Sequence, residues 1–218
     1  MGLLETIRNT DSVGQFVALL MLLMSIASWV VILWKARVLW RALRHVPQAI
    51  AAFWRATDFE AGTQAAAAFD PSKLVGDLIA ATAGAQANTL AAASDRSHHL
   101  TRMLRDALHR IVAKLQYGQV LLATVGSTAP FVGLLGTVWG IYHALVGISG
   151  GGQVSIDKIS GPVGEALIMT AAGLAVAIPA VLAFNVFGKM VAQIESDLEG
   201  FAYDLRELHK HPSRASQP

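Results

Sequence analysis

Three long apolar stretches dominate the sequence and limit what the chain can fold into. Residues 12–34 and 118–149 contain no Asp, Glu, Lys or Arg, and residues 159–188 contain a single one, Glu165. A helix needs about 20 predominantly apolar residues to cross a bilayer, and each stretch is long enough. Only 15% of all residues are charged, against about 25% in ordinary soluble domains. The sequence therefore predicts an all-α membrane protein with three transmembrane helices.

The first stretch differs from a secretory signal peptide. Its apolar run continues through Leu33, which is longer than a typical signal core, and Glu5 and Asp11 precede it instead of a basic cluster. We therefore expect residues 12–34 to form an uncleaved transmembrane helix.

The basic residues predict how the three helices are oriented. Residues 35–117 hold 11 of the 17 Lys and Arg residues and residues 189–218 hold 4, whereas residues 1–11 and 150–158 hold one each. Basic residues concentrate in the short cytoplasmic segments of membrane proteins. The sequence therefore predicts a periplasmic N-terminus, a cytoplasmic domain over 35–117, a periplasmic loop over 150–158 and a cytoplasmic tail.

The predicted cytoplasmic domain has the composition of helices. Alanine runs at 65–68 and 91–93 favour helix, and Asp70 followed by Pro71 is typical of a helix start. Apolar residues recur at helical spacing over 100–115. This helical pattern leads directly into the second apolar stretch, and it predicts one long helix that continues into the second span. No segment has the pattern of a strand.

Glu165 is the first candidate functional residue. A carboxylate in hydrocarbon is costly, so an ionisable residue within a span is a functional-site hypothesis by default. The alternative is a carboxylate near the outer end of its helix, close to Lys158, that is wetted at the membrane interface. From its position alone, the two interpretations carry equal weight.

Thr137 and Thr170 are the second candidates, because each lies deep within a span. A buried hydroxyl can relay a proton or hold a water, but threonine also commonly bonds the carbonyl of its own helix three or four residues back. At about 100° per residue, Glu165 and Thr170 are about 140° apart on their helix. They therefore cannot share one narrow stripe.

Small residues suggest close helix packing in the second and third spans. Small side chains let helix backbones approach each other in lipid, and four glycines are candidates for such contacts: Gly133, Gly136, Gly140 and Gly173.

Other apparent motifs do not indicate a site. The chain has no cysteine, and the spacing of His98, His99 and His109 does not suit a metal. The glycines at 150–152 lack the Lys and Ser/Thr of a phosphate-binding loop. The sequence therefore predicts no metal site, no cofactor, no enzymatic chemistry and no nucleic-acid binding.

Two ungapped signatures resemble a known family of membrane proteins. Residues 127–141 read STAPFVGLLGTVWGI and residues 161–181 read GPVGEALIMTAAGLAVAIPAV. They resemble the second and third spans of ExbB and TolQ proteins, which belong with MotA to one family of proton channels. The resemblance implies that Glu165, Thr137 and Thr170 form the proton pathway.

The resemblance also implies partners and a location. Family members form homopentamers in the bacterial inner membrane around a dimer of a single-span partner, ExbD or TolR, which brings an essential aspartate into the membrane. The proton current is thought to drive rotation and to energise TonB or TolA in the periplasm.

Details of the two signatures bear on the branch of the family. Two features favour ExbB, namely the sequence of residues 161–169 and the glycine-rich segment 147–152. His143, in contrast, lies at a position where TolQ proteins often carry histidine. Three predicted spans argue against the four-span MotA branch. A passive scaffold remains a further alternative, although it would have no reason to keep Glu165 in lipid.

Overall fold

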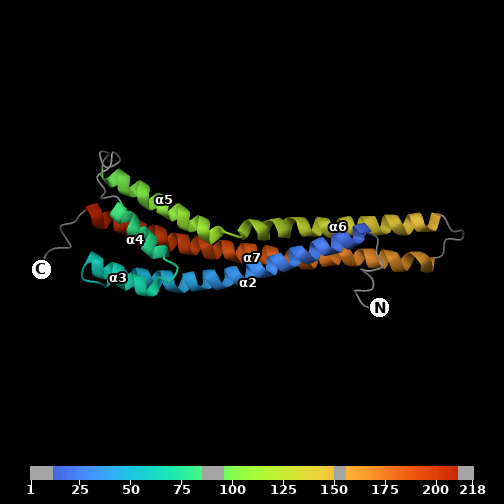
Figure 1. The fold of residues 1–218 in the computed structure, drawn as a ribbon, viewed down its shortest axis with the longest axis horizontal. Coiled ribbons are helices and arrows are strands. Elements are labelled where there is room, and N and C mark those ends of the chain that lie inside the picture. Colours follow the sequence, from blue (N-terminus) through green and yellow to red (C-terminus); the bar gives the residue numbers. More distant parts are fainter. Residues whose placement is uncertain (1–11, 85–95, 150–155, 211–218) are drawn as a thin grey trace. The chain divides into compact units, whose positions relative to one another are not determined.

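The computed structural model describes residues 12–84, 96–149 and 156–210, which form six α-helices and no strand. Three of these helices are long and apolar enough to cross a membrane. This confirms the prediction of an all-α, three-span protein. The helices are α2 (Ser12–Trp54), α3 (Phe59–Phe69), α4 (Leu74–Gly84), α5 (Arg96–Gln116), α6 (Gln119–Ser149) and α7 (Ile156–Lys210) (Figure 1).

The chain divides into two compact units, and each is described by itself. The membrane unit comprises Met1–Lys35 and Gly118–Val186, and the second unit comprises Ala36–Tyr117 and Phe187–Pro218. Both α2 and α7 extend well beyond the apolar stretches that predicted them and contribute residues to both units. Long helices therefore continue from the first and third spans into the second unit.

In the membrane unit, α6 is the most enclosed of the three spans. Of its most apolar 18 residues 39% are buried, against 17% for α2 and for α7. Gly136 lies against Val17 of α2 and Met169 of α7 at the same point. The spans α2 and α7 therefore keep most of their apolar surface free for lipid or for further protein chains.

The second unit has a core of its own. The rings of Phe53, Phe59 and Phe201 meet edge to face, with centroid distances of 5.3 Å between Phe53 and Phe201 and 5.6 Å between Phe53 and Phe59. Such pairs stabilise beyond their area of burial. Helix α4 packs along α5. Buried side chains from four helices complete this core: Leu39, Val46, Val75, Leu78, Leu104, Ile111, Ile194, Leu198 and Leu205.

The prediction of one helix running from residue 100 into the second span is wrong. Helix α5 ends at Gln116, and α6 begins at Gln119. Between them Gly118 has a φ of +83°, a left-handed conformation that glycine adopts without the steric cost that other residues meet. The break is therefore a glycine helix end.

The predicted helix start at Asp70 and Pro71 needs a smaller correction. Asp70 is the C-cap of α3, and Pro71 lies in the turn that follows it. The Asp70 carboxylate nevertheless accepts hydrogen bonds from the backbone N–H groups of Leu74 (3.0 Å) and Gly76 (2.8 Å). It therefore caps α4 from outside the helix. The alanine run at 65–68 lies in α3 as expected, and the run at 91–93 lies outside the described residues.

Candidate functional site

The structure brings Thr137 of α6 and Thr170 of α7 together. Their hydroxyl oxygens are 2.5 Å apart, and Thr137 is only 6% exposed. The Thr137 hydroxyl also lies 3.1 Å from the carbonyl oxygen of Gly133 and 3.1 Å from that of Ala166 on the facing helix. A hydroxyl has one hydrogen to donate and two lone pairs. Thr137 can therefore donate to one carbonyl while it accepts from Thr170.

This geometry combines the two interpretations of the threonines. The contact of Thr137 with Gly133 is the ordinary bond to the carbonyl of its own helix, four residues back. Its contacts with Ala166 and Thr170 cross between helices. The result is a small polar cluster inside an otherwise apolar helix pair.

Close backbone contact between α6 and α7 makes this cluster possible. A Cβ atom added to Gly133 would fall 2.6 Å from the carbonyl oxygen of Met169, and one added to Gly173 would fall 2.6 Å from that of Ala129. A Cβ on Gly140 would fall 2.9 Å from the Cβ of Ala166. Without side chains at these positions, the two helices approach closely enough for Thr137 to reach Ala166.

Glu165 lies beside this cluster in sequence but points in a different direction. It is exposed on the surface of the single chain, whereas the next residue, Ala166, is buried against Gly140 and accepts from Thr137. Along the axis of α7, Glu165 therefore lies at the level where Thr137 contacts Ala166. Thr170 faces α6, so Glu165 and Thr170 occupy different faces of α7, as their angular separation predicted.

Two buried polar residues of α2 were not recognised from the sequence. Lys35 begins the basic segment 35–117, yet it is 2% exposed, and so is Ser28 two turns earlier. Seven residues are close to two helical turns, which puts both on one face of α2. The spacing alone could have suggested a shared face, but not which face is buried.

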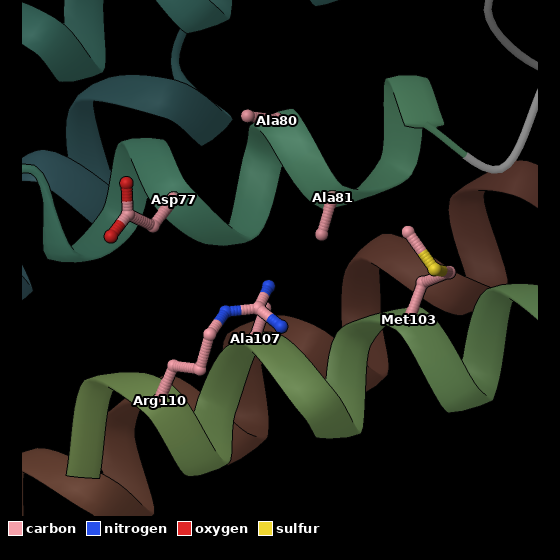
Figure 2. A pocket seen from close by; sticks show the side chains of 6 residues that line it. All are labelled: Asp77, Ala80, Ala81, Met103, Ala107 and Arg110. Atoms are coloured by element: carbon pink, nitrogen blue, oxygen red, sulfur yellow. The ribbon is translucent and has the colours of Figure 1, made fainter. Parts of the chain in front are cut away.

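The second unit contains an open hollow between α4 and α5. It has a volume of about 340 Å³ and is lined by Asp77, Ala81, Met103, Ala107 and Arg110, with Ala80 at its edge (Figure 2). The Asp77 carboxylate is 3.0 Å from the ammonium of Lys114. Within the described residues, no group of three His, Asp or Glu side chains could hold a metal.

The chain is similar in sequence to ExbB and TolQ proteins from several bacteria. The chain is 44% identical over 222 residues to the biopolymer transport protein ExbB of Xanthomonas campestris pv. campestris (strain B100), which covers 94% of this chain and 87% of that protein. It is 41% identical to the ExbB of Neisseria meningitidis serogroup A, with 88% and 89% covered. The Tol-Pal system protein TolQ of Haemophilus influenzae is 30% identical, with 92% and 90% covered.

The sequence profile of a membrane protein family matches the chain as well. The matching family is described as the MotA/TolQ/ExbB proton channel family, and the match covers residues 76–200. This range includes α6, the apolar part of α7 and all of Thr137, Glu165 and Thr170. The chain is thus a multi-pass membrane protein that belongs to the MotA/TolQ/ExbB proton channel family.

Proposed function

We propose that this chain is the proton-channel subunit of an inner-membrane motor of the ExbB type, which uses the proton motive force to energise TonB-dependent outer-membrane transport. The observation that carries the proposal is its similarity to ExbB proteins, at 44% and 41% identity over most of both chains. The TolQ protein of Haemophilus influenzae is 30% identical.

In this proposal, Glu165 is the group that takes up and releases the proton. It is the only acidic side chain in residues 118–188 apart from Asp157 near the outer end, and it is exposed to whatever surrounds the single chain. A charge that moves across the membrane gains about 2.3 kcal/mol per 100 mV. Glu165 therefore meets its proton donor or acceptor outside its own chain.

Thr137 and Thr170 line the pathway without titrating. Their hydroxyls supply donors and acceptors at the depth of Glu165, and a hydroxyl does not ionise in the physiological range. They place polar groups between α6 and α7 at the level of Glu165, on a different face of α7 from the carboxylate.

The exposed apolar surface of the spans supports a ring of copies around a guest. In the proposed arrangement, the N-terminus is periplasmic, the C-terminus is cytoplasmic, and five copies surround two helices of an ExbD-like partner that engages a TonB-like protein. Large apolar side chains stay exposed on α6 and α7, among them Phe131 at 70% and Leu182 at 61%. One copy cannot cover these faces by itself.

Complementation separates the ExbB role from the TolQ role. The chain, expressed together with its own single-span partner, is introduced into bacteria that lack both ExbB and TolQ. We expect restored uptake of iron siderophores and continued sensitivity to detergent. Restored detergent resistance without siderophore uptake would assign the chain to the Tol-Pal system instead, and restoration of neither would contradict a motor role.

Valine substitutions of the two threonines are expected to reduce activity severely. Thr137→Val and Thr170→Val keep the shape but remove the hydroxyl bridge, and an unpaired buried polar group costs about 1–3 kcal/mol. Thr→Ser at either position should be mild. Siderophore uptake and the yield of assembled complex are measured. Thr124→Val is the control, because Thr124 is exposed and bonds only its own helix, at Val120. Full activity in both valine variants would mean that the two hydroxyls only form hydrogen bonds with backbone carbonyl groups and have no role in the proton pathway.

Cysteine cross-linking tests where the guest helix lies. Ala172 and Val176 share the stripe of Glu165 on α7 and are half-buried, whereas Leu22 and Ile26 of α2 are more than half exposed. Single cysteines at 172 and 176 are expected to cross-link to the partner helix, and cysteines at 22 and 26 are not. The native chain has no cysteine, so there is no background. Cross-links from α2 alone would overturn the arrangement.

A further inference from the structure

One face of α2 carries apolar side chains along the membrane span and arginines directly beyond it. At about 100° per residue, five apolar residues lie within about 40° of the direction of Arg37 on this helix. All five are more than half exposed, with Val30 at 62% and Leu33 at 64%; the set is Leu19, Leu23, Ile26, Val30 and Leu33. Arg41 and Arg44 follow Arg37 within the same 40° and are exposed too. Because α2 is a single helix from Ser12 to Trp54, this is one continuous stripe.

Spacing along α2 sets the depth of the arginines. At about 1.5 Å per residue, Arg37 lies about 6 Å beyond Leu33 and Arg41 about 12 Å beyond it. The headgroup layer of a bilayer is about 5–8 Å thick on each side, and arginine side chains bend towards it over several ångströms. Arg37 and Arg41 can therefore reach phosphate groups, and Arg44 lies within a Debye length, about 8–10 Å, of them.

Within the described residues, Arg37, Arg41 and Arg44 form no ion pair. The sequence contains no Asp or Glu between Asp11 and Asp58. The ion pairs found in the described residues join Lys114 to Asp77 and Arg206 to Glu207, and none of them involves Arg37, Arg41 or Arg44. Lys35 contrasts with them, because it points to the opposite side of α2 and is 2% exposed. The three guanidinium groups are thus presented together to the surroundings.

Tryptophans flank the same level of the helix. Trp34 is 49% exposed and Trp40 is 60% exposed. Tryptophan is enriched where hydrocarbon gives way to headgroups. Arginine binds phosphate oxygens through a planar fork of donors, often two at a time.

We propose that Arg37, Arg41 and Arg44 form a binding site for anionic phospholipid headgroups of the inner leaflet. Acyl chains lie along the apolar part of the α2 stripe, and phosphate groups meet Arg37 and Arg41. A cluster of basic residues directly beyond a span attracts anionic lipid, by about 1 kcal/mol for each residue near the surface, which is a factor of about five in binding. The partner of this face is therefore a lipid, not a protein.

Brominated-lipid quenching tests the site on the whole purified oligomer. The protein is placed in vesicles of phosphatidylcholine with increasing phosphatidylglycerol, one lipid being brominated, and quenching of tryptophan fluorescence gives the relative binding of the two lipids. Trp34 and Trp40 lie at the site and report on it. We expect a preference for phosphatidylglycerol that weakens as salt is raised.

Matched charge variants decide where this preference arises. In the triple variant Arg37→Gln, Arg41→Gln and Arg44→Gln, the preference for phosphatidylglycerol over phosphatidylcholine should fall at least about five-fold. This is the factor expected for the loss of a single arginine. The control replaces three exposed arginines of α5, Arg102, Arg105 and Arg110, and changes the net charge equally. It should keep the full preference. Elution of each variant as an oligomer shows that it is folded.

Three outcomes would overturn the proposal. The wild-type protein could show no preference for phosphatidylglycerol, the α2 variant could keep it, or the two triple variants could lose it equally. The last result would indicate a diffuse effect of net charge. The experiment requires neither proton conduction nor the single-span partner, so its result is independent of the proposed motor function.

Discussion

A complex that carries Glu165→Gln should assemble in normal amounts and fail to energise transport. Glutamine keeps the size and polarity of the side chain and removes its ability to bind and release a proton. The energy of the transmembrane potential, about 2.3 kcal/mol per charge per 100 mV, is captured only if a group titrates along the path. Because Glu165 is exposed in the single chain, the change should leave α6–α7 packing intact. We therefore expect siderophore uptake at the level of cells that lack the protein.

The same substitution elsewhere on α7 provides the control. Glu199 lies on α7 in the second unit and is exposed, so Glu199→Gln should leave uptake unchanged. Glu165→Asp, which still titrates but is one methylene shorter, should keep part of the activity. Uptake at the wild-type rate in Glu165→Gln would exclude Glu165 as the proton carrier.

The three spans could be predicted from the sequence because hydrocarbon excludes charge. Any helix that crosses a bilayer needs a long run of apolar residues, and 12–34, 118–149 and 159–188 are such runs. The extensions of α2 to Trp54 and α7 to Lys210 depend instead on packing in the second unit. Buried residues such as Leu39 and Leu198 stabilise them there, and no local pattern marks where such a helix must end.

The sequence contains a signal for the break at Gly118. Lys114 lies in the last turn of α5, and Gly118 follows two residues after its end, which is the usual pattern at a helix C-terminus. The amphipathic pattern up to Leu115 and the apolar run from 118 hid it, because both are compatible with a helix. A single glycine within such a pattern does not distinguish a helix end from a packing contact.

The sequence identified the individual candidate residues, but it did not predict the contact between Thr137 and Thr170. Thr137 and Thr170 are 33 positions apart, and no spacing rule links residues on two different helices. Their hydrogen bond depends on how closely α6 approaches α7. The separate faces of Glu165 and Thr170, by contrast, follow directly from the helical repeat, so this part was accessible from the sequence.

The second large effect is expected from adding one methyl group to the α6–α7 contact. In Gly133→Ala or Gly173→Ala, the new Cβ would lie 2.6 Å from a backbone carbonyl oxygen of the facing helix. A backbone atom cannot rotate away as a side chain can, so the helices must separate. Overpacking of this kind costs about 1–3 kcal/mol and occasionally more, and the separation also stretches the Thr137–Thr170 hydrogen bond. Both variants should give little assembled complex and little uptake.

Two other glycines of α7 provide controls, and for Gly173 the comparison lies within one helix. Nothing lies within 4 Å of a Cβ built on Gly188 or Gly200, so Gly188→Ala and Gly200→Ala should be tolerated. They should even be slightly stabilising, since alanine is favoured over glycine inside a helix by up to about 1 kcal/mol. The yield and thermal stability of the purified oligomer are measured for all four variants. Equal stability of the two pairs would mean that α6 and α7 do not touch through Gly133 and Gly173, and the position of Thr137 against Ala166 would then lose its structural basis.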